Sequence, residues 1–111
     1  MADTNIDYLL TVFGEHLITP VPPMPRLVTS IPVAAGDTVE HTFDDTTEFM
    51  SFRVPPGTEG ASMLGGSMAE ASGKTFLPIY PGDEGRKVDP GSKVCIKNSG
   101  ASAIEIYIAE I

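Results

Sequence analysis

The chain has 111 residues, of which 15 are acidic and 7 are basic, and its formal net charge is −8. This balance argues against binding to nucleic acid or to an anionic membrane, because contact with phosphates requires clustered Lys and Arg. The length predicts a single domain that buries roughly two thirds of its unfolded surface. The single cysteine, Cys95, excludes an internal disulfide framework, and we expect it to be a small buried thiol in a strand.

The first residues give no sign of export or membrane insertion. They are acidic, no basic region precedes an apolar run, and no apolar run approaches the ~20 residues that a membrane span needs. We therefore expect a soluble protein that is made in a cytosol.

Two local structures fit residues 4–17. A capping box between Thr4 and Asp7, together with apolar residues at near-helical spacing, predicts a helix. Residues 9–13 also suit a short buried strand, and Gly14 would end either element. The apolar positions are Ile6, Leu9, Leu10, Phe13 and Leu17.

A proline-rich stretch follows at residues 19–25. Its four prolines remove four backbone donors, so the stretch should run extended in a polyproline-like path. We therefore expect residues 1–26 to form an N-terminal arm and residues 27–111 to form the folded domain. The arm could pack on its own domain or reach a neighbouring subunit, and stiff proline segments suit the second role because they lose little entropy when fixed.

From residue 27 onward the pattern is that of strands and turns. Alternation of apolar and polar residues at intervals of about ten, with Gly and Pro between them, predicts an all-β fold: a small antiparallel β-sandwich or jelly roll. Pro78 should confine its strand to a sheet edge. We expect a hairpin or a loose loop at residues 57–73 and a turn at residues 81–85. The expected strands are residues 27–33, 38–43, 49–54 and 75–80.

The last quarter of the chain carries the clearest strand pattern. Two alternating runs, beginning near Lys93 and Ile104, are separated by residues 98–102, which suit a hairpin connection. The other face of the final strand is apolar as well, so we expect this strand to be buried on both faces, inside the sandwich or against another subunit. The candidate oligomer-interface residues on that face are Tyr107, Ala109 and Ile111, with Ala103 preceding them.

Sites for metals and catalysis are weakly supported. His16 and His41 are too far apart in sequence for a metal-ligand spacing, and cupins, which share the jelly roll, carry a strand-borne set of histidines that this chain lacks. We interpret His41 as a core or interface histidine. The acidic turn of Asp44, Asp45 and Glu48 has too few oxygen ligands for calcium. No serine lies in a nucleophile-elbow pattern, so we expect no metal, no cofactor and no enzymatic activity.

In layout, the proline-rich arm, the cysteine-poor β domain and the ending at residues 90–107 resemble small structural proteins of tailed-phage virions, nearest to capsid decoration (cement) proteins. The resemblance implies a non-enzymatic virion protein, made in the host cytoplasm, that binds itself as a homo-oligomer, with a trimer favoured. It also implies the major capsid protein or another virion protein as partner. The arm residues implied as partner contacts are Leu9, Leu10, Phe13, Leu17, Pro20, Pro22 and Pro23.

Two other functions remain open from the sequence. One is a tail or fibre component of the same kind of particle. The other is a small β-sandwich module that binds carbohydrate, which the composition disfavours because sugars usually stack on exposed aromatic rings. The chain has no Trp, and its tyrosines are Tyr8, Tyr80 and Tyr107.

Overall fold

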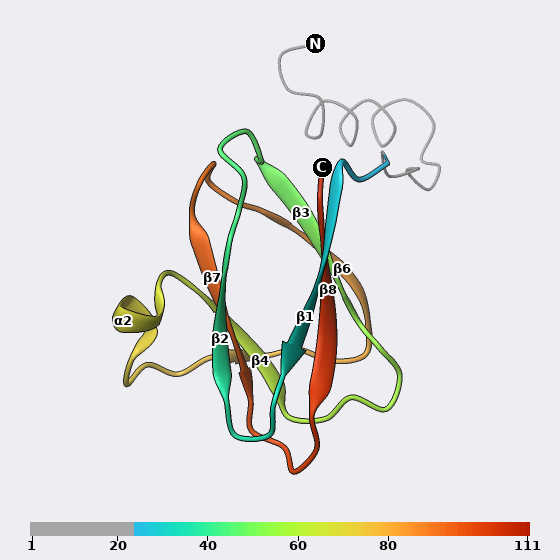
Figure 1. The fold of residues 1–111 in the computed structure, drawn as a ribbon, viewed down its shortest axis with the longest axis vertical. Helices are drawn as coiled ribbons and strands as arrows, with labels where there is room; N and C mark the ends of the chain where they lie inside the picture. The colour runs from blue at the N-terminus through green and yellow to red at the C-terminus, as the bar shows by residue number, and fades with distance from the viewer. Residues whose placement is uncertain (1–23) are drawn as a thin grey trace, which may run out of the picture.

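The computed structural model describes residues 24–111, which form two four-stranded antiparallel sheets packed face to face (Figure 1). The first sheet has the strand order β1-β8-β3-β6 and the second has the order β2-β7-β4-β5. The predicted all-β sandwich or jelly roll is confirmed. The elements are β1 (Leu27–Val33), β2 (Thr38–Thr42), β3 (Phe49–Val54), β4 (Ala61–Gly65), α2 (Met68–Ala71), β5 (Leu77–Pro78), β6 (Gly82–Lys87), β7 (Lys93–Asn98) and β8 (Ile104–Glu110).

The arm predicted at residues 1–26 falls almost wholly outside the described residues. So do the helix or strand expected at residues 4–17 and the predicted partner contacts Leu9, Leu10, Phe13, Leu17, Pro20, Pro22 and Pro23. Strand β1 begins at Leu27, where the sequence places the start of the domain. Within residues 24–111, no helix is long and apolar enough to cross a membrane.

The core lies between the two sheets, and alternation along β1, β3, β4 and β8 supplies much of it. In β3, Met50, Phe52 and Val54 are buried, as their period of two predicts. In β8, Ile106 and Ile108 have no exposed surface. The other core residues come from β1, β4 and β7 and from positions just after β2 and β5: Ile31, Val33, Phe43, Ala61, Met63, Ile79, Val94 and Ile96.

The predicted hairpin between the last two strands is wrong. β7 pairs with β2 and β4 in the second sheet, whereas β8 pairs with β1 and β3 in the first. Residues 99–103 therefore cross from one sheet to the other, beside the similar crossing between β1 and β2 (Figure 1). Loop length and turn residues suit both a hairpin and a crossing, so local sequence could not choose between them.

Two other segments differ from the sequence-based expectation. Residues 81–85 were predicted as a turn, but residues 82–85 belong to β6, which pairs along its full length with β3. Residues 61–65, predicted as a hairpin or loose loop, form β4, an interior strand between β7 and β5. Both have low β-propensity, and it is pairing with a regular neighbouring strand that makes them strands. The predicted edge position of the strand containing Pro78 is confirmed in β5.

The final strand is buried on one face only within the described part of the chain. β8 is an interior strand of the first sheet, but Glu105 and Tyr107 on its outer side are exposed, and so is Ala103 before it. Burial of this outer face by another subunit stays a prediction.

The loop between β3 and β4 contacts the crossing between β7 and β8, where Gly60 lies against Gly100. Ser99 N donates a hydrogen bond of 2.8 Å to Gly60 O, and a Cβ on Gly60 would lie 2.5 Å from Gly100 N. Gly60 has φ +79°, a left-handed conformation that favours glycine. Any side chain at Gly60 would therefore force the two loops apart.

We expect Gly60→Ala to lower the free energy of unfolding by about 3 kcal/mol, because it adds a backbone clash to the cost of a positive φ. Gly57→Ala is the matched control: Gly57 has φ +84°, but a Cβ added there would meet nothing within 4 Å. The control should cost only about 1 kcal/mol. Urea denaturation of both variants measures the difference, and equal losses would contradict the steric argument.

Candidate interaction surface and its anchor

The outer face of the first sheet brings the three predicted interface residues together. Tyr107 and Ala109 point outward from β8, and Ile111 continues that alternation, with its N–H donating to Phe49 O at 3.0 Å. Ala109 lies opposite Val28 in the β1–β8 register. The five residues Val28, Phe49, Tyr107, Ala109 and Ile111 are named here the sheet patch.

The sheet patch is apolar and partly exposed. Val28 is 58% exposed and Tyr107 is 36% exposed, whereas Ala109 and Ile111 are half-buried. The ring of Phe49 lies over Gly85 of β6, where a Cβ would come within 3.2 Å of ring carbons. The absence of a side chain at Gly85 thus leaves room for the Phe49 ring, which extends the apolar surface toward β6.

The rest of this face is polar and internally hydrogen-bonded. Arg53 binds Asp83 through two contacts, of 2.8 and 3.0 Å, and this interaction lowers the pKa of Asp83. Glu105 accepts hydrogen bonds from the hydroxyls of Ser30 and Tyr107, which lower the pKa of Glu105. An apolar patch bordered by polar groups is the usual composition of a protein interface.

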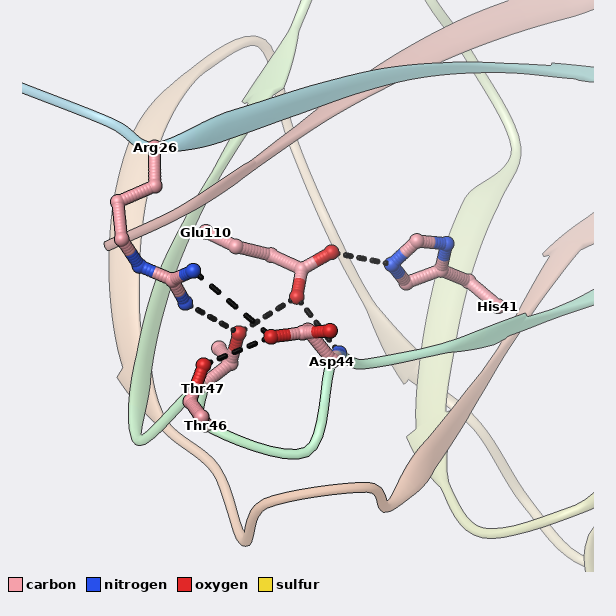
Figure 2. Close-up of polar contacts among 6 residues, drawn as sticks. All are labelled: Arg26, His41, Asp44, Thr46, Thr47 and Glu110. Atoms are coloured by element: carbon pink, nitrogen blue, oxygen red, sulfur yellow. Dashed lines mark hydrogen bonds and ion pairs between the residues drawn. The ribbon is translucent and has the colours of Figure 1, made fainter.

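A buried carboxylate anchors the chain next to this surface (Figure 2). Glu110, the last residue of β8, has no exposed surface. Its Oε1 accepts hydrogen bonds from Thr47 Oγ1 at 2.7 Å and Asp44 N at 2.9 Å, and its Oε2 lies 3.1 Å from His41 Nε2. Burial by itself would raise the pKa of Glu110, but the hydrogen bonds from Thr47, Asp44 and His41 outweigh it and hold the pKa below the ordinary value.

Arg26 joins the start of the domain to the same cluster. Its backbone N–H donates to Glu110 O at 2.7 Å, and its guanidinium Nη2 donates to Thr47 Oγ1 at 2.9 Å. Its Nη1 also lies 3.8 Å from Asp44 Oδ2. The start of the described domain is therefore fixed by a backbone bond to the final strand and by side-chain contacts with the β2–β3 turn. Figure 2 shows the side-chain contacts.

The sequence interpretation of His41 is confirmed, but its partner was missed. The His41 ring is nearly buried, with its edge against Phe43 at a centroid distance of 5.1 Å, and its nitrogen faces Glu110. The signal for Glu110 was available: the alternation of Ile104, Ile106 and Ile108 puts residue 110 on the core side.

The acidic turn and the cysteine have structural roles. Asp44 accepts a hydrogen bond from Thr46 Oγ1 at 2.7 Å, which lowers the pKa of Asp44, while Asp45 and Glu48 are exposed. Cys95 is buried, as predicted, and burial raises the pKa of its thiol. Among the described residues, no three His, Cys, Asp or Glu side chains gather closely enough to hold a metal ion.

Comparison with known proteins identifies the architecture. No protein-family model and no curated protein sequence matches the chain. Among solved structures it is similar to a de novo designed double-stranded β-helix, with 19% identity and a TM-score of 0.53 over 77% of this chain and 99% of that one. It is also similar to a predicted oxalate decarboxylase from Thermotoga maritima, with 18% identity and a TM-score of 0.51 over 78% of this chain and 66% of that one.

These likenesses establish the fold alone. The strand order agrees with a double-stranded β-helix, in which two antiparallel sheets are joined by crossings at each end. At this level of identity, the activity named for the Thermotoga maritima protein concerns that protein only, because one fold carries many functions.

Proposed function

We propose that the protein is a non-enzymatic virion structural protein that decorates a capsid and stabilises the shell through contacts between copies and through its N-terminal arm. The observation that carries this proposal is the sheet patch. Tyr107, Ala109 and Ile111 gather with two further apolar residues on one outward face of an interior strand. Such a face is best covered by a partner protein.

The anchor of Arg26 supports the same function. An arm that holds a protein to a shell transmits force to the point where it enters the domain. Here that point is bonded to the backbone of Glu110 and to the side chain of Thr47, rather than lying on a free loop. The proposed assembly is a closed homo-oligomer, with a trimer favoured, because closed symmetry would cover the sheet patch of every copy.

We expect the full chain to be an oligomer whose affinity falls roughly 30-fold in Tyr107→Ala, the loss of about 2 kcal/mol typical of an aromatic interface residue. Tyr80→Ala is the matched control, because Tyr80 is 74% exposed and lies outside the patch. Light scattering over a dilution series measures both, and equal affinities in the two variants would contradict a role for the patch.

Purified particles of the virus that encodes the protein provide the second test. The proposal requires the protein in those particles, bound to the capsid, and a chain missing from them would contradict it. Localisation on the tail instead would replace capsid decoration by a tail or fibre role. A version starting at Met24 keeps Arg26 and its bonds, so loss of particle binding in that version would be due to residues 1–23.

A further inference from the structure

Strand β6 leaves one edge of the first sheet open. Within residues 24–111 it pairs with β3 on one side and with no strand on the other, and all six of its residues are exposed. Two of the other edge strands, β1 and β5, contain a proline, which removes a backbone donor. β6 contains none, so its free edge offers a complete row of donors and acceptors to another strand.

The backbone groups on this edge belong to the odd-numbered residues of β6. Val88 N, just after the strand, donates to Glu48 O at 3.0 Å. Because hydrogen-bonded pairs alternate along an antiparallel ladder, β6 bonds to β3 through its even-numbered residues. The free backbone groups are therefore those of Asp83, Gly85 and Lys87.

The charges of β6 are arranged symmetrically about Gly85. Two acidic residues, Asp83 and Glu84, precede it, and two basic residues, Arg86 and Lys87, follow it. A second copy of the strand can run antiparallel to the first, with a twofold axis at Gly85. Asp83 of one copy then lies opposite Lys87 of the other on the outer face of the sheet, and Glu84 lies opposite Arg86 on the inward face. Opposite charges on facing residues stabilise a strand pair.

We propose that two copies of the chain pair through their β6 edges in this register and join their first sheets into one continuous sheet. The residues with free backbone groups then face each other, so Asp83 with Lys87, and Gly85 with its own copy, can exchange hydrogen bonds in pairs. In strand addition of this kind the main chain supplies affinity and the side chains supply specificity. The inference does not depend on the virion role.

The neighbouring registers are unfavourable. A twofold axis at Glu84 or at Arg86 would set a charged residue opposite its own copy, which is repulsive. A shift by one residue would set free backbone groups against groups that are already bonded to β3. The edge therefore matches its own copy in one register.

Charges on an edge strand commonly prevent association, because pairing would bury them or set like charges together. Neither applies here. The second sheet ends in the two residues of β5, so the side chains of Glu84 and Arg86 are 51% and 44% exposed although they point inward. These two residues form an ion pair within the chain, and each would also contact the opposite charge of the other copy. Asp83, which binds Arg53 on the outer face, would gain Lys87 as a further partner.

Gly85 suits the position on the axis. The ring of Phe49 lies over it on the outer face, where a Cβ would come within 3.2 Å of ring carbons. Facing residues of a hydrogen-bonded pair have Cα atoms about 5.5 Å apart, so the Phe49 rings of the two copies would meet across the axis. Aromatic rings attract each other at centroid distances of about 4.5–7 Å. This contact would join the sheet patches of the two copies.

Disulfide trapping between two variants of the full chain tests the register. Glu84→Cys and Arg86→Cys are made in separate chains, because these positions face each other only between copies. Their Cα atoms would lie about 4.5 Å apart, which suits a disulfide. In either variant alone the introduced thiols would be offset by two residues, with Cα atoms about 7–8 Å apart, which is too far. In the mixed pair, the remaining Arg86 and Glu84 still face each other.

We expect the mixture to form a disulfide-linked heterodimer at least about ten times faster than either variant alone forms a homodimer. Non-reducing gels measure this when one variant carries a mass tag. Protein on the order of 100 μM is appropriate, because a single strand edge is a small interface. Cys95 can stay, because burial raises the pKa of its thiol and slows its oxidation.

A mixture of Glu84→Cys with Asp37→Cys is the matched control for random collision, since Asp37 is exposed in the turn between β1 and β2. Trapping of Glu84→Cys with Arg86→Cys no faster than this control would overturn the proposal. Homodimers that form as fast as the heterodimer would also overturn it, because they would exclude the register centred on Gly85.

Charge reversal gives a second test that also separates this contact from the sheet patch. In a Tyr107→Ala background, which weakens the patch, Arg86→Glu makes the inward row of β6 acidic and Glu84→Arg makes it basic. Each variant should repel its own copy, whereas in the mixture every facing inward pair has opposite charges. Light scattering should therefore show monomers for each variant alone and dimers for the mixture. A mixture that stays monomeric would overturn the edge contact and leave the sheet patch unaffected.

Discussion

Replacing Glu110 by Gln should destabilise the protein by about 2–4 kcal/mol, because the carboxylate is fully buried and accepts bonds from three groups. An amide can keep its oxygen on Thr47 Oγ1 and Asp44 N, which both bond to Oε1, but its NH2 group then replaces Oε2 beside His41 Nε2. The negative charge that all three groups contact is lost as well. For a domain of this size the Tm should fall by roughly 10–20 °C. Calorimetry at pH 7 measures the change.

The matched control is Glu48→Gln, in which the side chain is exposed and close in sequence to the same turn. The free energy of unfolding of this control should lie within about 0.5 kcal/mol of the wild-type value. If Glu110→Gln lowered the free energy of unfolding no more than Glu48→Gln does, the hydrogen bonds of the Glu110 carboxylate would contribute nothing to stability.

The same cluster sets the direction of a pH dependence. The pKa of Glu110 in the folded protein lies below its ordinary value of 4.5, so the ionised carboxylate stabilises the fold above that pH. The contribution is lost as the pH falls through the lowered pKa. The wild-type chain should therefore lose stability on acidification below about pH 4.5, and Glu110→Gln should show a flatter profile in that range.

Replacing Asn98 by Asp should lower the free energy of unfolding by more than about 3 kcal/mol at pH 7, although the two side chains have nearly the same shape. Asn98 is fully buried, and its Nδ2 donates to Val33 O at 3.1 Å and to Ser102 O at 2.8 Å. Its Oδ1 accepts from Gly100 N at 2.9 Å. The amide thus ties the β7–β8 crossing to the end of β1.

A carboxylate at this position would retain the bond from Gly100 but would face two carbonyl oxygens. It would also bury a charge, which raises the pKa of the introduced group. Stability of this variant should therefore increase as the pH is lowered from 7 toward 5, opposite to Glu110. Asn98→Ala, which introduces no charge, should lack this rise, and urea unfolding at both pH values measures it. A loss independent of pH in Asn98→Asp would show that the charge is not buried.

The sequence located most strands but not their partners. Alternation identified β1, β2, β3 and the runs of β7 and β8, because one buried face imposes a period of two whatever strand lies alongside. The separation of β7 and β8 into different sheets depends on contacts between distant residues, such as the bond from Asn98 to Val33 O. No pattern within residues 93–110 contains that information.

Local motifs were partly readable. Ser67 and Glu70 form a capping box at the start of α2, which is a pattern visible in the sequence. Glu70 N donates to Ser67 Oγ at 3.2 Å, and Ser67 N donates to Glu70 Oε1 at 2.8 Å. The surrounding Gly and Ser residues nevertheless favoured a loop. β6 carries no such signature. It is a strand because β3 supplies its hydrogen bonds and Phe49 covers its glycine.

By itself, the sequence determined the all-β class, the buried Cys95 and the outward row of Tyr107, Ala109 and Ile111, since each follows from composition or from alternation along one strand. Only the tertiary structure decided which residues meet across the fold. It brought Arg26, His41, Thr47 and Glu110 into one cluster, and it left the edge of β6 open. Such sites arise where segments far apart in the chain are packed together, and the energy that selects them comes from burial and long-range pairing rather than from local preference.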